Sequence, residues 1–190
     1  TSPCALMSRR SSSSFTVRNG VSRPGEAGEV TMIRLFVMDV DGTMTDGAVF
    51  LDGEGREFKR FDVKDGLGVA MLAASGVRAA IISGRYSAVT DRRAKELGID
   101  IVVQGVKDKL SELKRMASDM NLDPEEIAYI GDDVNDRECI AWAGRGFAPS
   151  DARHEAKEAA DVVTEARGGS GAVRDAADDI LNFNGTRETK

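Results

Sequence analysis

Two clusters of aspartate stand where apolar segments of the sequence end. Asp39 and Asp41 follow the apolar run 33–38, and Asp132 follows residues 127–130. Buried carboxylates are costly unless they are paired or bound to a cation, so their place after two buried strands indicates a functional site. Because the carboxyl ends of parallel strands meet at one edge of a sheet, we expect Asp39, Asp41 and Asp132 to bind a hard divalent cation there.

Two further side chains suit phosphate chemistry. Ser83 ends a third apolar segment, and Lys109 begins a predicted helix. Singly, each has an ordinary explanation as a strand-end cap or a solvated lysine, just as Asp before Gly42 can be a simple turn former. Hydrolysis of a phosphate monoester requires a nucleophile, neutralisation of the phosphoryl oxygens and a proton for the leaving alkoxide. Taken together, the acids, the hydroxyl and the ammonium group offer all three.

The order of these motifs resembles the haloacid dehalogenase superfamily of phosphohydrolases, over roughly residues 32–185. The matching motifs are D-V-D-G-T at 39–43, Ser83, Lys109 and G-D-D-V-N-D at 131–136. The resemblance implies that Asp39 is a nucleophile that forms an aspartyl phosphate and that Asp41 is the general acid and base. Ser83 and Lys109 would hold the phosphoryl group. Magnesium would be bound by the Asp39 side chain, the Asp41 backbone carbonyl and Asp132.

Within that superfamily, four local patterns resemble the capless phosphatases of 3-deoxy-D-manno-octulosonate 8-phosphate (KDO 8-phosphate). They are F-D-V-K-D-G-L-G at 61–68, S-G-R at 83–85 with Arg93 following, Q-G-V-K-D-K at 104–109 and G-G-S-G-A-V-R-D at 168–175. The resemblance implies an acid sugar phosphate as substrate, a small molecule used in lipopolysaccharide precursor synthesis. The implied substrate contacts are Asp41, Asp62, Val63, Lys64, Asp65, Gly66, Arg85, Arg93 and Lys109. An arginine can bind the sugar carboxylate bidentately, whereas Ala70 stands where the family often has a basic residue.

Other interpretations stay open at this stage. Enzymes for nine-carbon (sialic acid or KDN) 9-phosphates tend to carry Glu where this chain has Arg85, which favours the eight-carbon substrate. Arg85 and Arg93 can also be exposed helix-face cations. A noncatalytic oligomerisation domain, of the kind fused to acylneuraminate cytidylyltransferases, and a receiver domain are the alternatives from other classes. The intact catalytic set argues against an oligomerisation domain without activity. The presence of Asp41 two residues after Asp39 argues against a receiver domain.

Other polar residues lie outside the catalytic and substrate-binding sets. Asp133 is expected to orient Lys109 or the metal shell, and Asp136 to cap a helix. The Gly-rich segment before Arg174 is either a flexible connection or part of the enclosure of the site. His154, the only histidine, is expected to be exposed.

A short hairpin is predicted at residues 48–61, where two β-prone runs flank the turn 52–55. An insertion at this point is usually a cap domain in the superfamily, but this one is too short. The resemblance implies a homotetramer in which the hairpin meets neighbouring subunits. The alternative, a solvated hairpin, would expose the apolar side chains of Val49, Phe50, Phe58 and Phe61.

Alternating strands and helices predict an α/β fold: a three-layer, Rossmann-like (haloacid dehalogenase-like) domain with a mostly parallel sheet, the small β-hairpin insertion and no cap domain. Besides the first strand and the hairpin, the predicted strands are 77–82, 99–103, 127–130, 146–148 and 162–163. The predicted helices are 67–75, 87–97, 108–120, 133–143, 154–160 and 172–181.

Composition narrows the class of protein further. The chain has 190 residues and a net charge of -6, which argues against general nucleic-acid binding. No segment approaches the ~18 apolar residues of a membrane span. Cys4 and Cys139 are too few for a disulfide framework or a zinc site, which fits a reducing, cytoplasmic location. Residues 1–31, rich in Ser and Arg, are expected to be a disordered leader or linker before the phosphatase domain at 32–190, with organelle targeting as the alternative.

Overall fold

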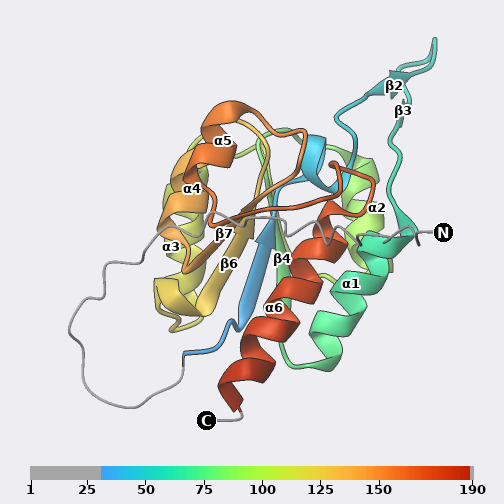
Figure 1. Ribbon diagram of the computed structural model, residues 1–190. Coiled ribbons are helices and arrows are strands. Elements are labelled where there is room, and N and C mark those ends of the chain that lie inside the picture. The colour runs from blue at the N-terminus through green and yellow to red at the C-terminus, as the bar shows by residue number, and fades with distance from the viewer. Residues whose placement is uncertain (1–30, 189–190) are drawn as a thin grey trace, which may run out of the picture.

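A parallel six-stranded sheet forms the centre of the computed structural model, which describes residues 31–188 (Figure 1). Its strand order is β5-β4-β1-β6-β7-β8. The strands are β1 (Leu35–Met38), β4 (Arg78–Ser83), β5 (Ile101–Gln104), β6 (Ile127–Ile130), β7 (Arg145–Ala148) and β8 (Val162–Val163). The chain moves outward from β1 in one direction first and then in the other. The strand order therefore reverses between β1 and β6, the position at which open α/β sheets bind ligands.

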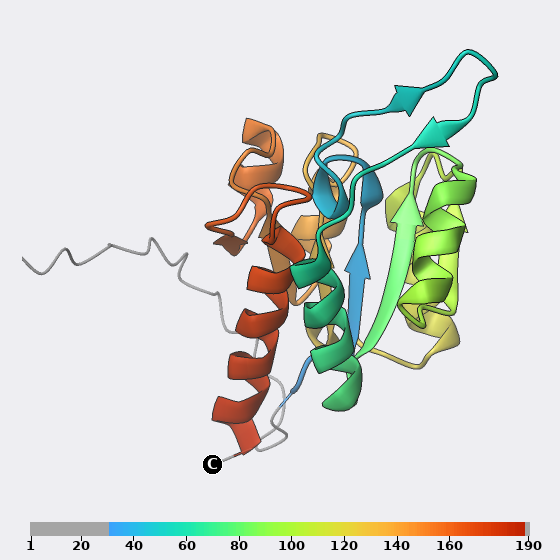
Figure 2. The same cartoon turned by 90° about the vertical axis from the view of Figure 1, so that its right-hand side faces the viewer.

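Helices cover both faces of this sheet (Figures 1 and 2). The helices are α1 (Val63–Ala74), α2 (Ala88–Glu96), α3 (Lys109–Asp119), α4 (Arg137–Trp142), α5 (His154–Ala159) and α6 (Ala172–Glu188). One core cluster packs residues of α1, α2 and α6 against the sheet, and the other packs α3, α4 and α5. Because both faces are covered, the strands are continuous apolar runs; all four residues of β1 are fully buried. The predicted three-layer α/β fold is confirmed.

The insertion between β1 and α1 is a hairpin that projects beyond the sheet (Figure 2). A turn at Val40–Met44 follows β1, and β2 (Phe50–Leu51) then pairs antiparallel with β3 (Glu57–Phe58). Both strands are shorter than the β-prone runs of the sequence. The hairpin stands above the same edge of the sheet to which β1 delivers Asp39.

Three helix boundaries differ from those predicted. Helix α1 begins at Val63 rather than residue 67, because the Asp62 carboxylate accepts a hydrogen bond from the backbone N–H of Lys64 at 2.7 Å and caps the helix. Helix α4 begins at Arg137 rather than 133, since residues 133–136 form a turn around the Asp136 carboxylate. Helix α6 continues past residue 181 to Glu188. The other predicted helices agree within two residues.

Among the residues that the structure describes, no helix is long and apolar enough to cross a membrane. The predicted leader lies, apart from Thr31, outside those residues. Its role stays a prediction.

Candidate active site

A cavity of about 590 Å³ opens at the carboxyl end of the sheet. It contains five of the predicted site residues, Asp39, Asp41, Ser83, Arg85 and Lys109. The rest of its lining is Gly47, Val49, Gly84, Val106, Lys107, Asp133 and Asn135. Four separate segments of the chain therefore meet in one hollow, at the point where the strand order reverses.

Lys109 is the buried cation of this site. Its ammonium Nζ lies 2.7 Å from Asp39 Oδ1 and 2.7 Å from Asp136 Oδ1, and the side chain is 2% exposed. Asp136 also accepts a hydrogen bond from the hydroxyl of Tyr129, at 2.7 Å. Asp133 was expected to orient Lys109 or the metal shell. The residue that orients Lys109 is Asp136, and Asp133 instead accepts a hydrogen bond from the backbone N–H of Val134.

The carboxylates around Lys109 outnumber this cation, and their pKa values show the consequence. Burial, together with the charge of Asp136, raises the pKa of Asp39 to about 8 against the opposing effect of Lys109. Burial and Asp136 likewise raise the pKa of Asp132 to about 6. Burial alone would lower the pKa of Lys109, but the charges of Asp39 and Asp136 outweigh it and hold that pKa above its ordinary value. The site thus has an excess of negative charge that a further cation would relieve.

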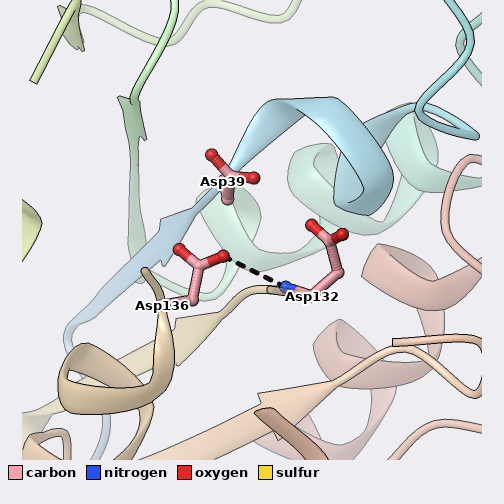
Figure 3. Close-up of side chains that lie close together, drawn as sticks. All are labelled: Asp39, Asp132 and Asp136. Carbon is pink, nitrogen blue, oxygen red and sulfur yellow. Dashed lines mark hydrogen bonds between the residues drawn. The ribbon is translucent and has the colours of Figure 1, made fainter. Parts of the chain in front are cut away.

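The donor set fits a hard divalent cation. Oxygens of Asp39, Asp132 and Asp136 lie within 4.8 Å of one another (Figure 3). Both oxygens of Asp136 already accept hydrogen bonds, Oδ1 from Lys109 and Tyr129 and Oδ2 from the backbone N–H groups of residues 132 and 133. Asp39 and Asp132 each have one oxygen engaged, by Lys109 and by Thr43, which leaves a second oxygen on each for a metal.

Gly42 allows Asp132 to approach the turn after β1. Its φ is +94°, and a Cβ at this position would lie 2.1 Å from Asp132 Oδ2. Any other residue would displace the Asp132 carboxylate, and the positive φ would strain that residue as well. The glycine of D-V-D-G is therefore required by packing as well as by the turn.

Asp41 is not part of that cluster, and its carboxylate meets two cations. Lys59 Nζ lies 2.6 Å from Asp41 Oδ1, and Arg85 Nε lies 3.4 Å from Asp41 Oδ2. Arg85 also donates to the Glu57 carboxylate at 2.5 Å. Although burial tends to raise the pKa of Glu57, the hydrogen bond and charge of Arg85 outweigh it and lower that pKa.

The predicted substrate residues at the start of α1 do not line this cavity in a single chain. Val63 is 81% exposed and Lys64 is exposed, while Gly66 is buried against Arg93. Arg93 donates to the backbone carbonyl of Asp62 at 3.3 Å. These residues, Asp62–Gly66 with Arg93, form a second group at the start of α1 and on α2, outside the cavity.

Asp65 has an observed role of a different kind. The residue is 3% exposed, and its carboxylate accepts a hydrogen bond from the backbone N–H of Arg174 at 2.9 Å, which ties α1 to the first turn of α6. Burial raises the pKa of Asp65 to about 6.

The Gly-rich segment before α6 packs against the turn after β1. The backbone N–H of Gly169 donates to the carbonyl of Thr43 at 2.9 Å, and a Cβ at Gly168 would overlap the carbonyl oxygen of Gly42. The Gly-rich segment is therefore packed against the turn that follows Asp39, and it is more than a flexible connection. The Arg174 side chain pairs with Asp178 on its own helix. His154 is exposed, as predicted.

Sequence reasoning missed Lys59 and Glu57. They occupy alternate positions of β3 and its continuation, so the period of two in a strand places both on one side. That alternation, E-x-K, was the available signal. The role of Asp136 was missed because it depends on a buried hydrogen bond between residues 27 positions apart.

The fold and this site define a class, the haloacid dehalogenase-like hydrolases. The sequence model of the family described as "haloacid dehalogenase-like hydrolase" matches residues 92–174. This match begins within α2 and includes Lys109 and Asp132.

Curated relatives and solved structures narrow the class. The chain is 41% identical to 3-deoxy-D-manno-octulosonate 8-phosphate phosphatase KdsC of Yersinia pestis over 149 residues, which is 78% of this chain and 80% of that protein. The same phosphatase of Escherichia coli is 37% identical over 78% of this chain and 79% of its own length. The chain therefore belongs to the family of 3-deoxy-D-manno-octulosonate 8-phosphate phosphatases.

Solved structures of this family share the fold. The Moraxella catarrhalis phosphatase, crystallised with magnesium, phosphate and KDO, is 41% identical with a TM-score of 0.80, over 84% of this chain and 92% of that one. The cobalt-bound phosphatase of Haemophilus influenzae is 37% identical with a TM-score of 0.78, over 82% and 91%.

Proposed function

We propose that this protein is a magnesium-dependent phosphatase that hydrolyses 3-deoxy-D-manno-octulosonate 8-phosphate to KDO and inorganic phosphate. The observation that carries the proposal is the single cavity in which Asp39, Asp41 and Lys109 meet with Ser83 and Arg85. Membership of the family supports the choice of substrate. The product would feed lipopolysaccharide precursor synthesis.

The groups in the cavity supply a two-step displacement. Asp39 would attack phosphorus and form an aspartyl phosphate while the bond from phosphorus to the sugar oxygen breaks. Asp41 would give its proton to the departing oxygen. It would then take a proton from the water that attacks phosphorus, which frees Asp39 and phosphate. Ser83 and Lys109 would hold the phosphoryl oxygens, the former by its hydroxyl and the latter by its charge.

A magnesium ion would be held by the side chains of Asp39 and Asp132 and the backbone carbonyl of Asp41. When bound, it supplies positive charge that offsets the repulsion between a carboxylate nucleophile and an anionic phosphate. Asp136 would remain outside this ligand set, because its oxygens hold Lys109, Tyr129 and two backbone N–H groups.

Arg85 is the proposed determinant of substrate choice. It lies at the cavity with its guanidinium between Asp41 and Glu57, where it can meet the polar end of an acid sugar. Sugar phosphates of the nine-carbon acids are the alternative substrates.

The test is phosphate release from KDO 8-phosphate and from KDN 9-phosphate, each with magnesium and with EDTA. We expect faster magnesium-dependent release from KDO 8-phosphate. Equal rates on the two sugars would contradict the substrate assignment, and rates unaffected by EDTA would contradict the cofactor. Complete inactivity would favour a noncatalytic oligomerisation domain.

We also propose that the protein acts as a homotetramer in which the hairpin meets other subunits. Four apolar side chains of the hairpin are exposed in the single chain: Val49 by 43%, Phe50 by 55%, Leu51 by 68% and Phe58 by 55%. An apolar surface of this kind is usually covered by a partner. In such an assembly, the group Asp62–Gly66 with Arg93 would contact the substrate bound in the cavity of another subunit. The cytoplasmic location expected from the sequence likewise stays a proposal, which cell fractionation would test.

A further inference from the structure

Lys59 carries a buried ammonium group on a hairpin that otherwise projects into solvent. Its side chain is 0% exposed. A surface lysine normally keeps its charged end in water, and burying that end is unfavourable unless a partner compensates. The partners are Asp41 Oδ1 at 2.6 Å and, further away, Glu57 Oε1 at 3.6 Å. The Lys59 ammonium group has therefore exchanged its solvation for an ion pair with Asp41.

The two oxygens of Asp41 have different surroundings. Oδ1 is held by Lys59, which is not among the residues that line the cavity. Oδ2 lies 3.4 Å from Nε of Arg85, a residue that does line it. A carboxyl group that transfers a proton must aim one oxygen at the leaving group. The hydrogen bond from Lys59 to Oδ1 restrains the rotation of the carboxyl group and leaves Oδ2 toward the cavity.

Glu57 fixes the segment that carries Lys59. Its carboxylate accepts hydrogen bonds from Arg85 Nη2 at 2.5 Å, Arg85 Nη1 at 3.3 Å and the hydroxyl of Ser87 at 3.3 Å. Arg85 and Ser87 belong to the loop between β4 and α2. These bonds anchor the hairpin to the loop between β4 and α2, two residues before Lys59. The anchor restrains the position of the Lys59 ammonium group beside Asp41.

We propose that Lys59 is a positioning residue that orients the Asp41 carboxyl group for proton transfer to the leaving sugar oxygen. This inference rests on the proposed phosphatase function. It gives the hairpin a task inside its own subunit, separate from any role in assembly.

The experiment compares Lys59→Met, Asp41→Asn and the double variant with the unaltered protein. Initial rates give kcat/KM for KDO 8-phosphate, which requires protonation of its leaving oxygen, and for p-nitrophenyl phosphate, whose leaving group departs without it. Rates on the aryl ester are read at high enzyme concentration. Lys95→Met, an exposed lysine of α2, is the matched control. Gel filtration and thermal melting show whether each variant is folded, and Lys59→Gln replaces Lys59→Met if that variant does not fold.

We expect Lys59→Met to lower kcat/KM for KDO 8-phosphate by at least about tenfold more than for p-nitrophenyl phosphate. KM for KDO 8-phosphate should change little, because Lys59 lies outside the cavity lining. In the Asp41→Asn background the same substitution should have almost no further effect. An equal loss on both substrates, no loss, or fully additive losses would overturn the inference. If the unaltered protein does not hydrolyse KDO 8-phosphate, the proposed function fails instead.

Discussion

At the residue scale, we expect Lys109 to contribute to stability in addition to its proposed role in phosphate binding. It is the buried cation among the carboxylates of Asp39, Asp132 and Asp136. Replacing it by methionine would leave buried charge without compensation, at a cost of about 3–5 kcal/mol. We expect Lys109→Met to lower the free energy of unfolding by about that amount in urea denaturation without magnesium. Lys95→Met should leave it unchanged. A variant as stable as the parent would contradict the role of this ammonium group.

Asp65 links stability to pH. Its pKa is raised from 3.8 to about 6 by burial, so the folded state binds this proton more tightly than the unfolded state. The resulting stability is present below pH 3.8 and is lost as the pH rises through about 6. Relative to Asp65→Asn, the parent should lose about 2 kcal/mol of unfolding free energy between pH 4 and 7. Asp100→Asn, at an exposed position, serves as the control. A difference that does not vary with pH would refute this account of Asp65.

At the scale of elements, the hairpin would serve the proposed assembly and the proposed catalysis through different residues. Its outer apolar residues are exposed, while Glu57 and Lys59 face the site. The double variant Phe50→Ser and Leu51→Ser should therefore elute from gel filtration as a smaller species than the parent. Its phosphatase activity should also be lower. Val134→Ser, at another exposed apolar residue, should elute like the parent. An unchanged elution volume for the hairpin variant would count against the proposed tetramer.

The elements were predictable where local sequence determines them. Apolar runs such as 127–130 coincide with strands, and Gly76 and Gly98 follow the ends of the first two helices. The start of α4 was not predictable, since Asp136 folds back to accept two backbone N–H groups that would otherwise begin the helix. Its partner Lys109 belongs to another helix, and such tertiary contacts leave no local pattern.

At the scale of the whole molecule, the sheet brings together acids that are distant along the chain. Parallel pairing of β1 with β6 in the register Met38 with Ile130 places Asp39 and Asp132 at one edge. This convergence was predictable from two apolar strands that each end in aspartate. The contacts of Lys59 were not, because they depend on how the hairpin folds over the sheet.

Magnesium should stabilise the folded molecule, because the ligands come together only after folding. At a magnesium concentration 100-fold above Kd, the gain would be about 2.7 kcal/mol, visible as a rise in Tm. EDTA should reverse the rise, and Asp132→Asn should abolish most of it. An equal rise in the Asp132→Asn protein would place the ion elsewhere.

The most direct test of the account is to trap the phosphoryl group on the protein. Borohydride reduces an aspartyl phosphate to homoserine, which mass spectrometry locates in the sequence. After quenching during turnover of KDO 8-phosphate with magnesium, we predict homoserine at position 39. The Asp39→Asn protein should show no turnover and no homoserine while it keeps the fold and assembly of the parent. Homoserine at another position, or undiminished phosphate release by Asp39→Asn, would contradict the central claim that Asp39 accepts the phosphoryl group.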